Sequence, residues 1–93
     1  ATDPAFKEDV LKCADWVASY LKNSHLKVEK WETENAPVIF ATDLRAGEGK
    51  ETLLIYCHYD VQPVDPLDEW ESPPFEPTLR GQEVYARGAS DNK

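Results

Sequence analysis

The 93-residue sequence has no methionine, two cysteines, two histidines and no long apolar run. A membrane-spanning helix needs about 20 consecutive apolar residues, so we expect no membrane span. Cys13 and Cys57 are too few for a disulfide framework, although one bond between them is compatible with the count. Free thiols are typical of a reducing compartment, which favours a cytoplasmic protein. Without an initiator methionine, we expect residue 1 to follow processing or an upstream segment.

Positive charge is also scarce. Ten Lys and Arg residues stand against eighteen Asp and Glu, for a net charge of −8. Nucleic acids and anionic membranes are bound through basic residues, so this balance argues against both partners. An acidic surface is compatible with cation binding, and it is equally typical of an ordinary soluble surface. With 41% hydrophobic and 11% aromatic residues, the chain is long enough and apolar enough for one small folded domain, residues 1–93.

The apolar pattern predicts an α/β fold, with one amphipathic helix followed by mixed strands and a hairpin. Asp3 and Pro4 predict the start of the helix. Apolar residues three and four positions apart continue it to about residue 22. Residues 26–34 and 38–41 are strand-like and flank a turn signal, so we expect them to form a β-hairpin.

The strongest predicted strand is 52–57, which is apolar at consecutive positions and should therefore be covered on both faces. Residues 61–77 contain five of the seven prolines and predict a long ordered loop. Trp70 and Phe75 are expected to anchor this loop to the body of the domain. Two short strands joined by a turn are predicted within 78–86.

The tripeptide His58-Tyr59-Asp60 follows the strongest predicted strand. Residues i and i+2 of an extended backbone point to the same side, roughly 6.5–7 Å apart. Asp60 can therefore hold one ring nitrogen of His58 while the other nitrogen binds a metal. Open α/β sheets place their sites at this end of the strands. Because the tripeptide is short, a strand-end histidine capped by a nearby acid, without a metal, remains an alternative.

A second loop, Arg87-Gly88-Ala89-Ser90-Asp91, also follows a predicted strand. A carboxylate such as that of Asp91 can bridge two divalent cations roughly 3.5–4 Å apart, or it can be an ordinary turn aspartate. Two such loops could converge at one sheet edge, although zinc sites use about three or four protein ligands. His25 lies in a helix-to-strand turn, and we interpret it as an exposed turn residue rather than a further ligand.

These residues closely resemble the start of the catalytic domain in the co-catalytic zinc peptidase and deacylase family. That family includes carnosinase-like dipeptidases, aminoacylases, acetylornithine deacetylases, succinyl-diaminopimelate desuccinylases and glutamate carboxypeptidases. The resemblance is specific over about residues 53–93 and looks most like the dipeptidase branch. It is carried by the sequence HYDVQP, by Trp70, Ser72 and Pro74-Phe75, by Gly81 and Tyr85, and by RGASDNK. It implies that the chain is the N-terminal part of a zinc-exopeptidase catalytic domain.

The resemblance also implies roles for three residues. His58 matches the histidine that binds one zinc, Asp60 matches the acid that orients this histidine and supports catalysis, and Asp91 matches the aspartate that bridges both metals. Two Zn²⁺ or Mn²⁺ ions are implied in the intact parent, and we expect no other cofactor site. A cis peptide bond between Asp91 and Asn92 is implied as well.

The general base of the family, a glutamate in a Glu-Glu pair, and its remaining metal ligands lie beyond the bridging aspartate. We therefore expect residues 1–93 to be the first piece of a longer enzyme and to be inactive alone. The reaction implied for the parent is hydrolysis of a peptide or N-acyl amide bond, in a dipeptide or an N-acyl amino acid, by metal-activated water. We expect the parent to be a cytoplasmic homodimer.

Two interpretations from other classes compete with an enzyme. A small acidic protein-binding module could use Trp31, Trp70 and the proline-rich loop as its contact surface. A redox or metal-storage protein could use Cys57 and His58, but adjacent residues of a strand point to opposite faces and share one metal poorly.

Overall fold

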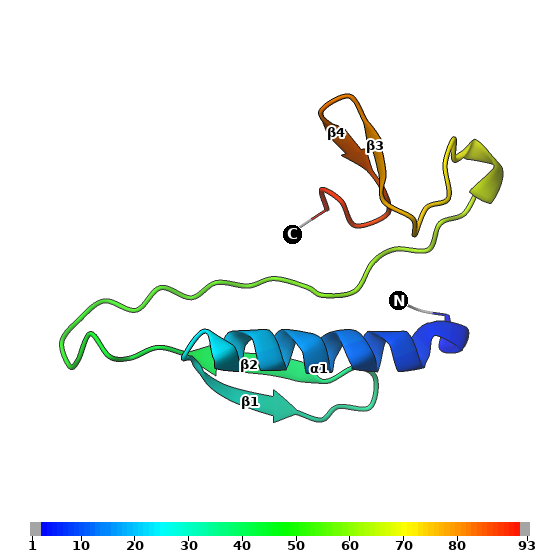
Figure 1. The fold of residues 1–93 in the computed structure, drawn as a ribbon. Helices are drawn as coiled ribbons and strands as arrows, with labels where there is room; N and C mark the ends of the chain where they lie inside the picture. Colours follow the sequence, from blue (N-terminus) through cyan, green and yellow to red (C-terminus); the bar gives the residue numbers. More distant parts are fainter. Residues whose placement is uncertain (1–2, 92–93) are drawn as a thin grey trace.

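The computed structural model describes residues 3–91 of the chain (Figure 1). Its regular elements form a helix–hairpin unit, a second hairpin and single turns of 3-10 helix. In chain order they are η1 (Pro4–Phe6), α1 (Lys7–Asn23), β1 (Lys27–Trp31), β2 (Val38–Thr42), η2 (Leu67–Glu69), β3 (Thr78–Arg80) and β4 (Glu83–Tyr85). The predicted α/β class, with one amphipathic helix and antiparallel strand pairs, is confirmed. None of the described helices is suited to crossing a membrane.

Helix α1 begins and ends close to the predicted positions. The Asp3 carboxylate accepts a hydrogen bond from the Ala5 N–H at 2.9 Å and caps the first turn, which is 3-10 helix rather than α-helix. At the other end, the Ser24 hydroxyl donates to the Tyr20 carbonyl at 3.0 Å. A side chain therefore caps the 3-10 turn that leads into α1, as the sequence pattern indicates, while α1 itself has no side-chain cap at its N-terminus.

Strands β1 and β2 form the predicted hairpin and pack against α1. The rings of Trp31 and Phe40 stack across the two strands, with centroids 4.7 Å apart. The ammonium group of Lys30 lies 2.7 Å from the Asp15 carboxylate and joins β1 to the helix. The core is nevertheless small, because Ala14, Pro37 and Pro74 are the only buried residues that the structure describes.

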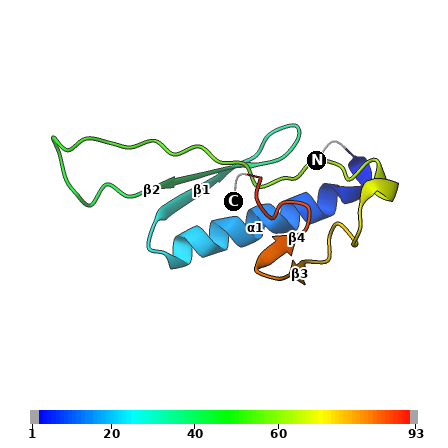
Figure 2. The same cartoon turned by 90° about the horizontal axis from the view of Figure 1, so that it is seen from above.

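The strand predicted at 52–57 is not formed. These residues form an extended stretch beside the helix–hairpin unit (Figures 1 and 2), but they belong to neither sheet of the described chain. Four apolar side chains in a row, Leu53, Leu54, Ile55 and Tyr56, are 74–85% exposed, and Cys57 is exposed too. A strand exists only when another strand satisfies its backbone groups. The prediction is wrong for this chain because the described residues supply no such neighbour.

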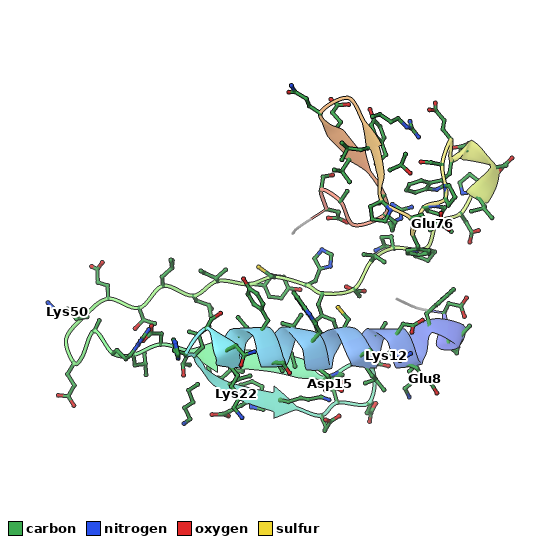
Figure 3. The ribbon with its side chains drawn as sticks, viewed as in Figure 1. Glu8, Lys12, Asp15, Lys22, Lys50 and Glu76 are labelled. Carbon is green, nitrogen blue, oxygen red and sulfur yellow. The ribbon has the colours of Figure 1, made fainter. Side chains whose placement is uncertain are left out.

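Figure 3 shows how this segment joins two distant parts of the molecule. Lys50 marks the bend that follows β2, whereas Glu76 lies in the separate C-terminal part. There, β3 and β4 pair across a turn in which Gly81 takes a positive φ of 63°. The predicted loop at 61–77 is present, and the Trp70 indole N–H anchors it by donating to the Val64 carbonyl at 2.9 Å. Phe75, the other expected anchor, is 58% exposed.

The exposed apolar run predicts self-association. We expect the 93-residue polypeptide to form concentration-dependent oligomers in size-exclusion chromatography with light scattering, because an unpaired apolar strand is a template for strand addition. Ile55→Lys should shift the population toward monomer. Leu44→Lys is the matched control, since Leu44 is also exposed (68%) but lies outside the run. A monomeric state of the unsubstituted 93-residue polypeptide, or equal effects of the two substitutions, would contradict this expectation.

Candidate metal centre

Tyr59 attaches the His58-Tyr59-Asp60 stretch to the helix–hairpin unit. Its hydroxyl donates to the Pro37 carbonyl at 2.5 Å, and its own carbonyl accepts a hydrogen bond from the Cys13 thiol at 3.4 Å. Because alternate residues of an extended backbone point to opposite sides, anchoring Tyr59 leaves His58 and Asp60 together on the other side. No described strand pairs with this backbone, so the contacts of Tyr59 fix its position in place of sheet hydrogen bonds.

One ring nitrogen of His58 is held by Asp60. The Nδ1 atom lies 3.1 Å from the Asp60 carboxylate Oδ1 and 2.9 Å from the carbonyl oxygen of the same residue. Both of these atoms are hydrogen-bond acceptors, so we assign the imidazole proton to Nδ1. In neutral His58 the lone pair is then on Nε2, the nitrogen that points away from Asp60.

The other ring nitrogen faces Asp91. His58 Nε2 lies 3.7 Å from Asp91 Oδ1, although 32 residues separate the two positions in the chain. This separation is too long for a hydrogen bond. With the proton on Nδ1, a nitrogen lone pair and a carboxylate oxygen are directed at the same space. Such a pair of electron donors is stabilised by a cation between them.

The pair fits two ligands of one zinc ion. Zinc–nitrogen and zinc–oxygen bonds are about 2.0–2.2 Å long, so ligands at a tetrahedral angle lie roughly 3.4 Å apart. The observed 3.7 Å is close to that value. The side chains of His58 and Asp91 are 31% and 66% exposed, which leaves the space between them accessible. Imidazole and carboxylate are also the ligand types that zinc and manganese accept.

The donor set is incomplete within the described part of the chain. Residues 3–91 contain no group of three or more His, Cys, Asp and Glu side chains suited to one metal ion. His25 follows α1 with a left-handed backbone (φ 65°) and borders a shallow depression beside β2. Asp43, which lines the same depression, is paired with Arg45, whose hydrogen bonds lower the pKa of this carboxyl to about 2. His25 therefore belongs to a separate, exposed turn, as its position in the sequence suggests.

Contacts of Arg87, the first residue of the loop that carries Asp91, hold this loop in place. The Arg87 N–H donates to the Pro74 carbonyl at 2.7 Å, and its guanidinium Nη2 donates to the Pro63 carbonyl at 2.9 Å. Gly88 follows with a positive φ of 82°, a backbone conformation that favours glycine. The peptide bond between Asp91 and Asn92, for which the resemblance implies a cis form, lies outside the described residues.

An open depression of about 820 Å³ adjoins this loop. It is bounded by the loop around η2, by both strands of the second hairpin, and by Ala89 and Ser90, which directly precede Asp91. Arg80 forms one wall, where its guanidinium contacts Glu71 at 2.8 Å and lies over the Tyr85 ring. A ligand held near Asp91 would therefore have polar and aromatic surface beside it.

The sequence predicts His58, Asp60 and Asp91 as site residues, and the structure brings them together, but the pattern did not indicate the residues that position them. Tyr59 was only the middle residue of a motif, and Cys13 was only part of the apolar face of the helix. Their contacts join positions 46 and 22 residues apart in the chain. The one available signal was the alternation of an extended backbone, which requires Tyr59 to face the helix when its two neighbours face away.

Comparison with known proteins relates these residues to a peptidase family. The family described as "Peptidase family M20/M25/M40" matches residues 54–93. Proteins named succinyl-diaminopimelate desuccinylase are similar over more of the chain. The one from Aromatoleum aromaticum is 38% identical over 81 residues, which cover 87% of this chain and 20% of that protein. No solved structure matches.

Two further relatives of the same name extend the comparison. The protein from Azoarcus sp. is 51% identical over 49 residues, which cover 53% of this chain and 13% of the relative. The protein from Blochmanniella floridana is 30% identical over 91 residues, which cover 97% of this chain and 24% of the relative. The likeness therefore includes the helix and first hairpin, and the chain spans a quarter or less of the length of these relatives.

The Tyr59 anchor predicts a stability effect that depends on pH. Tyr59→Phe should lower the free energy of unfolding by about 0.5–1.5 kcal/mol, because it removes one hydrogen bond to the Pro37 carbonyl. Burial raises the pKa of the Tyr59 phenol above its ordinary value, which is about 10. The stability due to the neutral phenol is therefore present below pH ~10 and lost as pH rises through the higher folded-state pKa.

Urea unfolding of both proteins from pH 7 to 11 measures this effect. The difference between wild type and Tyr59→Phe should shrink as the pH rises above about 10. Tyr56→Phe is the matched control, because Tyr56 is three residues away and 85% exposed. If Tyr56→Phe destabilised the protein as much as Tyr59→Phe, the anchor would have no special role.

Proposed function

Because the chain belongs to peptidase family M20/M25/M40, we propose that it is the metal-binding N-terminal part of an enzyme that hydrolyses amide bonds. The observation that carries the proposal is the His58 imidazole, which has Asp60 on one ring nitrogen and Asp91 3.7 Å from the other. A metal ligand needs this combination of a fixed tautomer and a second donor nearby.

The proposed roles follow from these contacts. Asp60 orients the ring, His58 would hold one ion, and Asp91 would serve as the carboxylate shared by both ions. Two Zn²⁺ or Mn²⁺ ions are proposed for the parent. When bound, such ions supply a nucleophilic water near neutral pH and a Lewis acid for the substrate carbonyl.

The remaining parts of the site are proposed to come from beyond residue 93. His58 and Asp91 are two ligands, whereas zinc sites use about three or four from the protein. Residues 1–93 would then be the N-terminal portion of a catalytic domain. This agrees with the short share of each relative that the chain matches. For the parent we propose a cytoplasmic homodimer.

The substrate class is proposed from the chemistry and from the relatives. Amide hydrolysis by metal-activated water suits both dipeptides and N-acyl amino acids. The relatives reported above are named as desuccinylases of succinyl-diaminopimelate, so N-succinyl amino acids are the first compounds to assay. Dipeptides come second, because the motifs around His58 look most like the dipeptidase branch.

The binding-module alternative has less support from the contacts. It requires Trp70 and Trp31 to be available for a partner. The Trp70 indole is hydrogen-bonded to Val64 and lies against the Arg87 guanidinium. The Trp31 ring is stacked on Phe40. Trp70 is thus engaged within the chain, whereas Trp31 stacks on one face and is still 46% exposed.

Substitutions in the full-length parent test the proposed roles. His58→Gln and Asp91→Asn should remove bound zinc, measured by elemental analysis, together with hydrolysis of N-succinyl amino acids. Asp60→Asn should lower zinc affinity or activity by about 10–100-fold, because it weakens the bond that orients the ring. His25→Asn is the matched control, since asparagine tolerates the left-handed backbone there, and it should change neither property. Zinc retained after loss of both His58 and Asp91 would refute the assignment.

The 93-residue polypeptide alone should be inactive. Supplied with zinc or manganese, it should show no chelator-sensitive hydrolysis of N-succinyl amino acids or dipeptides, because it contributes too few ligands for a catalytic site. Calorimetry should likewise detect no tight, stoichiometric zinc binding. Chelator-sensitive turnover above a protein-free blank would show that residues 1–93 contain a complete site.

A further inference from the structure

We propose that Arg87 is a positioning residue that sets the separation between His58 and Asp91. The proposal rests on the function proposed above, but its geometric part can be tested without metal or activity. Arg87 lies four residues before Asp91, and its side chain reaches the segment that begins at His58. It therefore contacts the segments of both proposed ligands without being a ligand itself.

The contacts of Arg87 tie three stretches of chain together. Its backbone N–H donates to the Pro74 carbonyl at 2.7 Å, which attaches the Asp91 loop to the end of the proline-rich loop. Its Nη2 donates to the Pro63 carbonyl at 2.9 Å, which attaches the same loop to the stretch five residues after His58. One residue thus links the two segments whose side chains meet at the candidate site.

Trp70 completes this attachment. The Arg87 guanidinium carbon lies 4.9 Å from the centroid of the Trp70 ring, and the Trp70 N–H donates to the Val64 carbonyl at 2.9 Å. Two stacked side chains therefore hold two consecutive carbonyls, those of Pro63 and Val64. The Arg87 Nε atom is buried and has no hydrogen-bond partner among the described residues. The internal contacts of the guanidinium are therefore the Nη2 hydrogen bond to Pro63 and the face that lies over Trp70.

The fold explains why such an attachment is needed. Residues 58–64 are extended but unpaired, and β3 and β4 pair with each other alone among the described strands. No described sheet thus fixes the distance between the two halves of the candidate centre. Side-chain contacts must do so, and a displacement of about 1 Å would separate two ligands that have to share one ion.

Arg80 offers a matched control. It is also an arginine of the C-terminal part, it also lies over an aromatic ring, with its guanidinium carbon 4.2 Å from the Tyr85 centroid, and it also makes a short contact, to Glu71. Its other contact is to Ser72. All of these partners lie within residues 71–85, so Arg80 stabilises the hairpin without contacting the segment that follows His58.

The first experiment measures metal affinity in the full-length protein. Arg87→Gln and Arg87→Lys should each lower zinc affinity, measured by competition with a chelator, by about tenfold or more. Lysine keeps the charge but lacks the planar group that stacks on Trp70 while donating to Pro63. Catalytic kcat should fall with the affinity, KM should stay close to wild type, and excess zinc should restore part of kcat. Arg80→Gln should leave zinc affinity unchanged.

The second experiment measures proximity directly. In a full-length background with Cys13 and Cys57 changed to serine, His58→Cys and Asp91→Cys place two thiols at the candidate centre. A short thiol-reactive crosslinker with two bromomethyl groups, which alkylates one thiol at each end and releases bromide, should join them readily when Arg87 is present and several-fold more slowly with Arg87→Gln, as followed by mass spectrometry. Arg80→Gln should not change the rate.

The outcomes separate the two proposals. Slower crosslinking with Arg87→Gln, in a parent protein that binds no zinc, would support the positioning role and refute the proposed function. Equal crosslinking rates would overturn the positioning role even in an active zinc enzyme. A rise in KM with unchanged zinc affinity would also overturn it, because Arg87 would then act on the substrate. An equal loss of zinc affinity with Arg80→Gln would overturn it by showing a general destabilisation.

Discussion

The central constraint is the imidazole of His58, which has a carboxylate near each of its nitrogens. Asp60 holds Nδ1, and Asp91 lies 3.7 Å from Nε2. Three groups that are normally negative or electron-rich are gathered in a chain whose net charge is already −8. The Nε2 lone pair and the Asp91 carboxylate face the same space, an arrangement that a cation between them would stabilise. The contacts of Tyr59 and Arg87 matter because they hold the segments that carry His58 and Asp91 in this arrangement.

A second feature is that residues 53–56 are apolar but exposed to solvent. Each large apolar side chain there would contribute roughly 1.5–3 kcal/mol if it were fully buried, yet all four are at least 74% exposed. The segment leads directly into His58, so the first proposed ligand follows a stretch that belongs to neither described sheet. A sheet that covered this segment would stabilise the fold and stiffen the candidate site at once. The proposed location of the remaining ligands, beyond residue 93, agrees with this need.

Prediction from sequence succeeded where structure depends on neighbours along the chain. The capped helix, the β1–β2 hairpin and the short β3–β4 pair each rely on local periodicity and turn residues, and each was found within a few residues. It failed for the strand at 52–57, because pairing requires a distant partner that composition cannot supply. The motifs around His58 and Asp91 pointed to the family that the comparisons confirm. Whether the enzyme resembles the dipeptidase or the desuccinylase branch in specificity stays a prediction.

By itself, the sequence determined which residue types can do the chemistry. The alternation of an extended backbone puts His58 and Asp60 on one side, and a glycine-containing loop follows a strand and ends in Asp91. Only the tertiary structure decided that these two loops meet. That meeting depends on contacts between residues far apart in the chain, namely Tyr59 with Pro37 and Arg87 with Pro63. No local pattern encodes such contacts, because each depends on the path of all the residues between its partners.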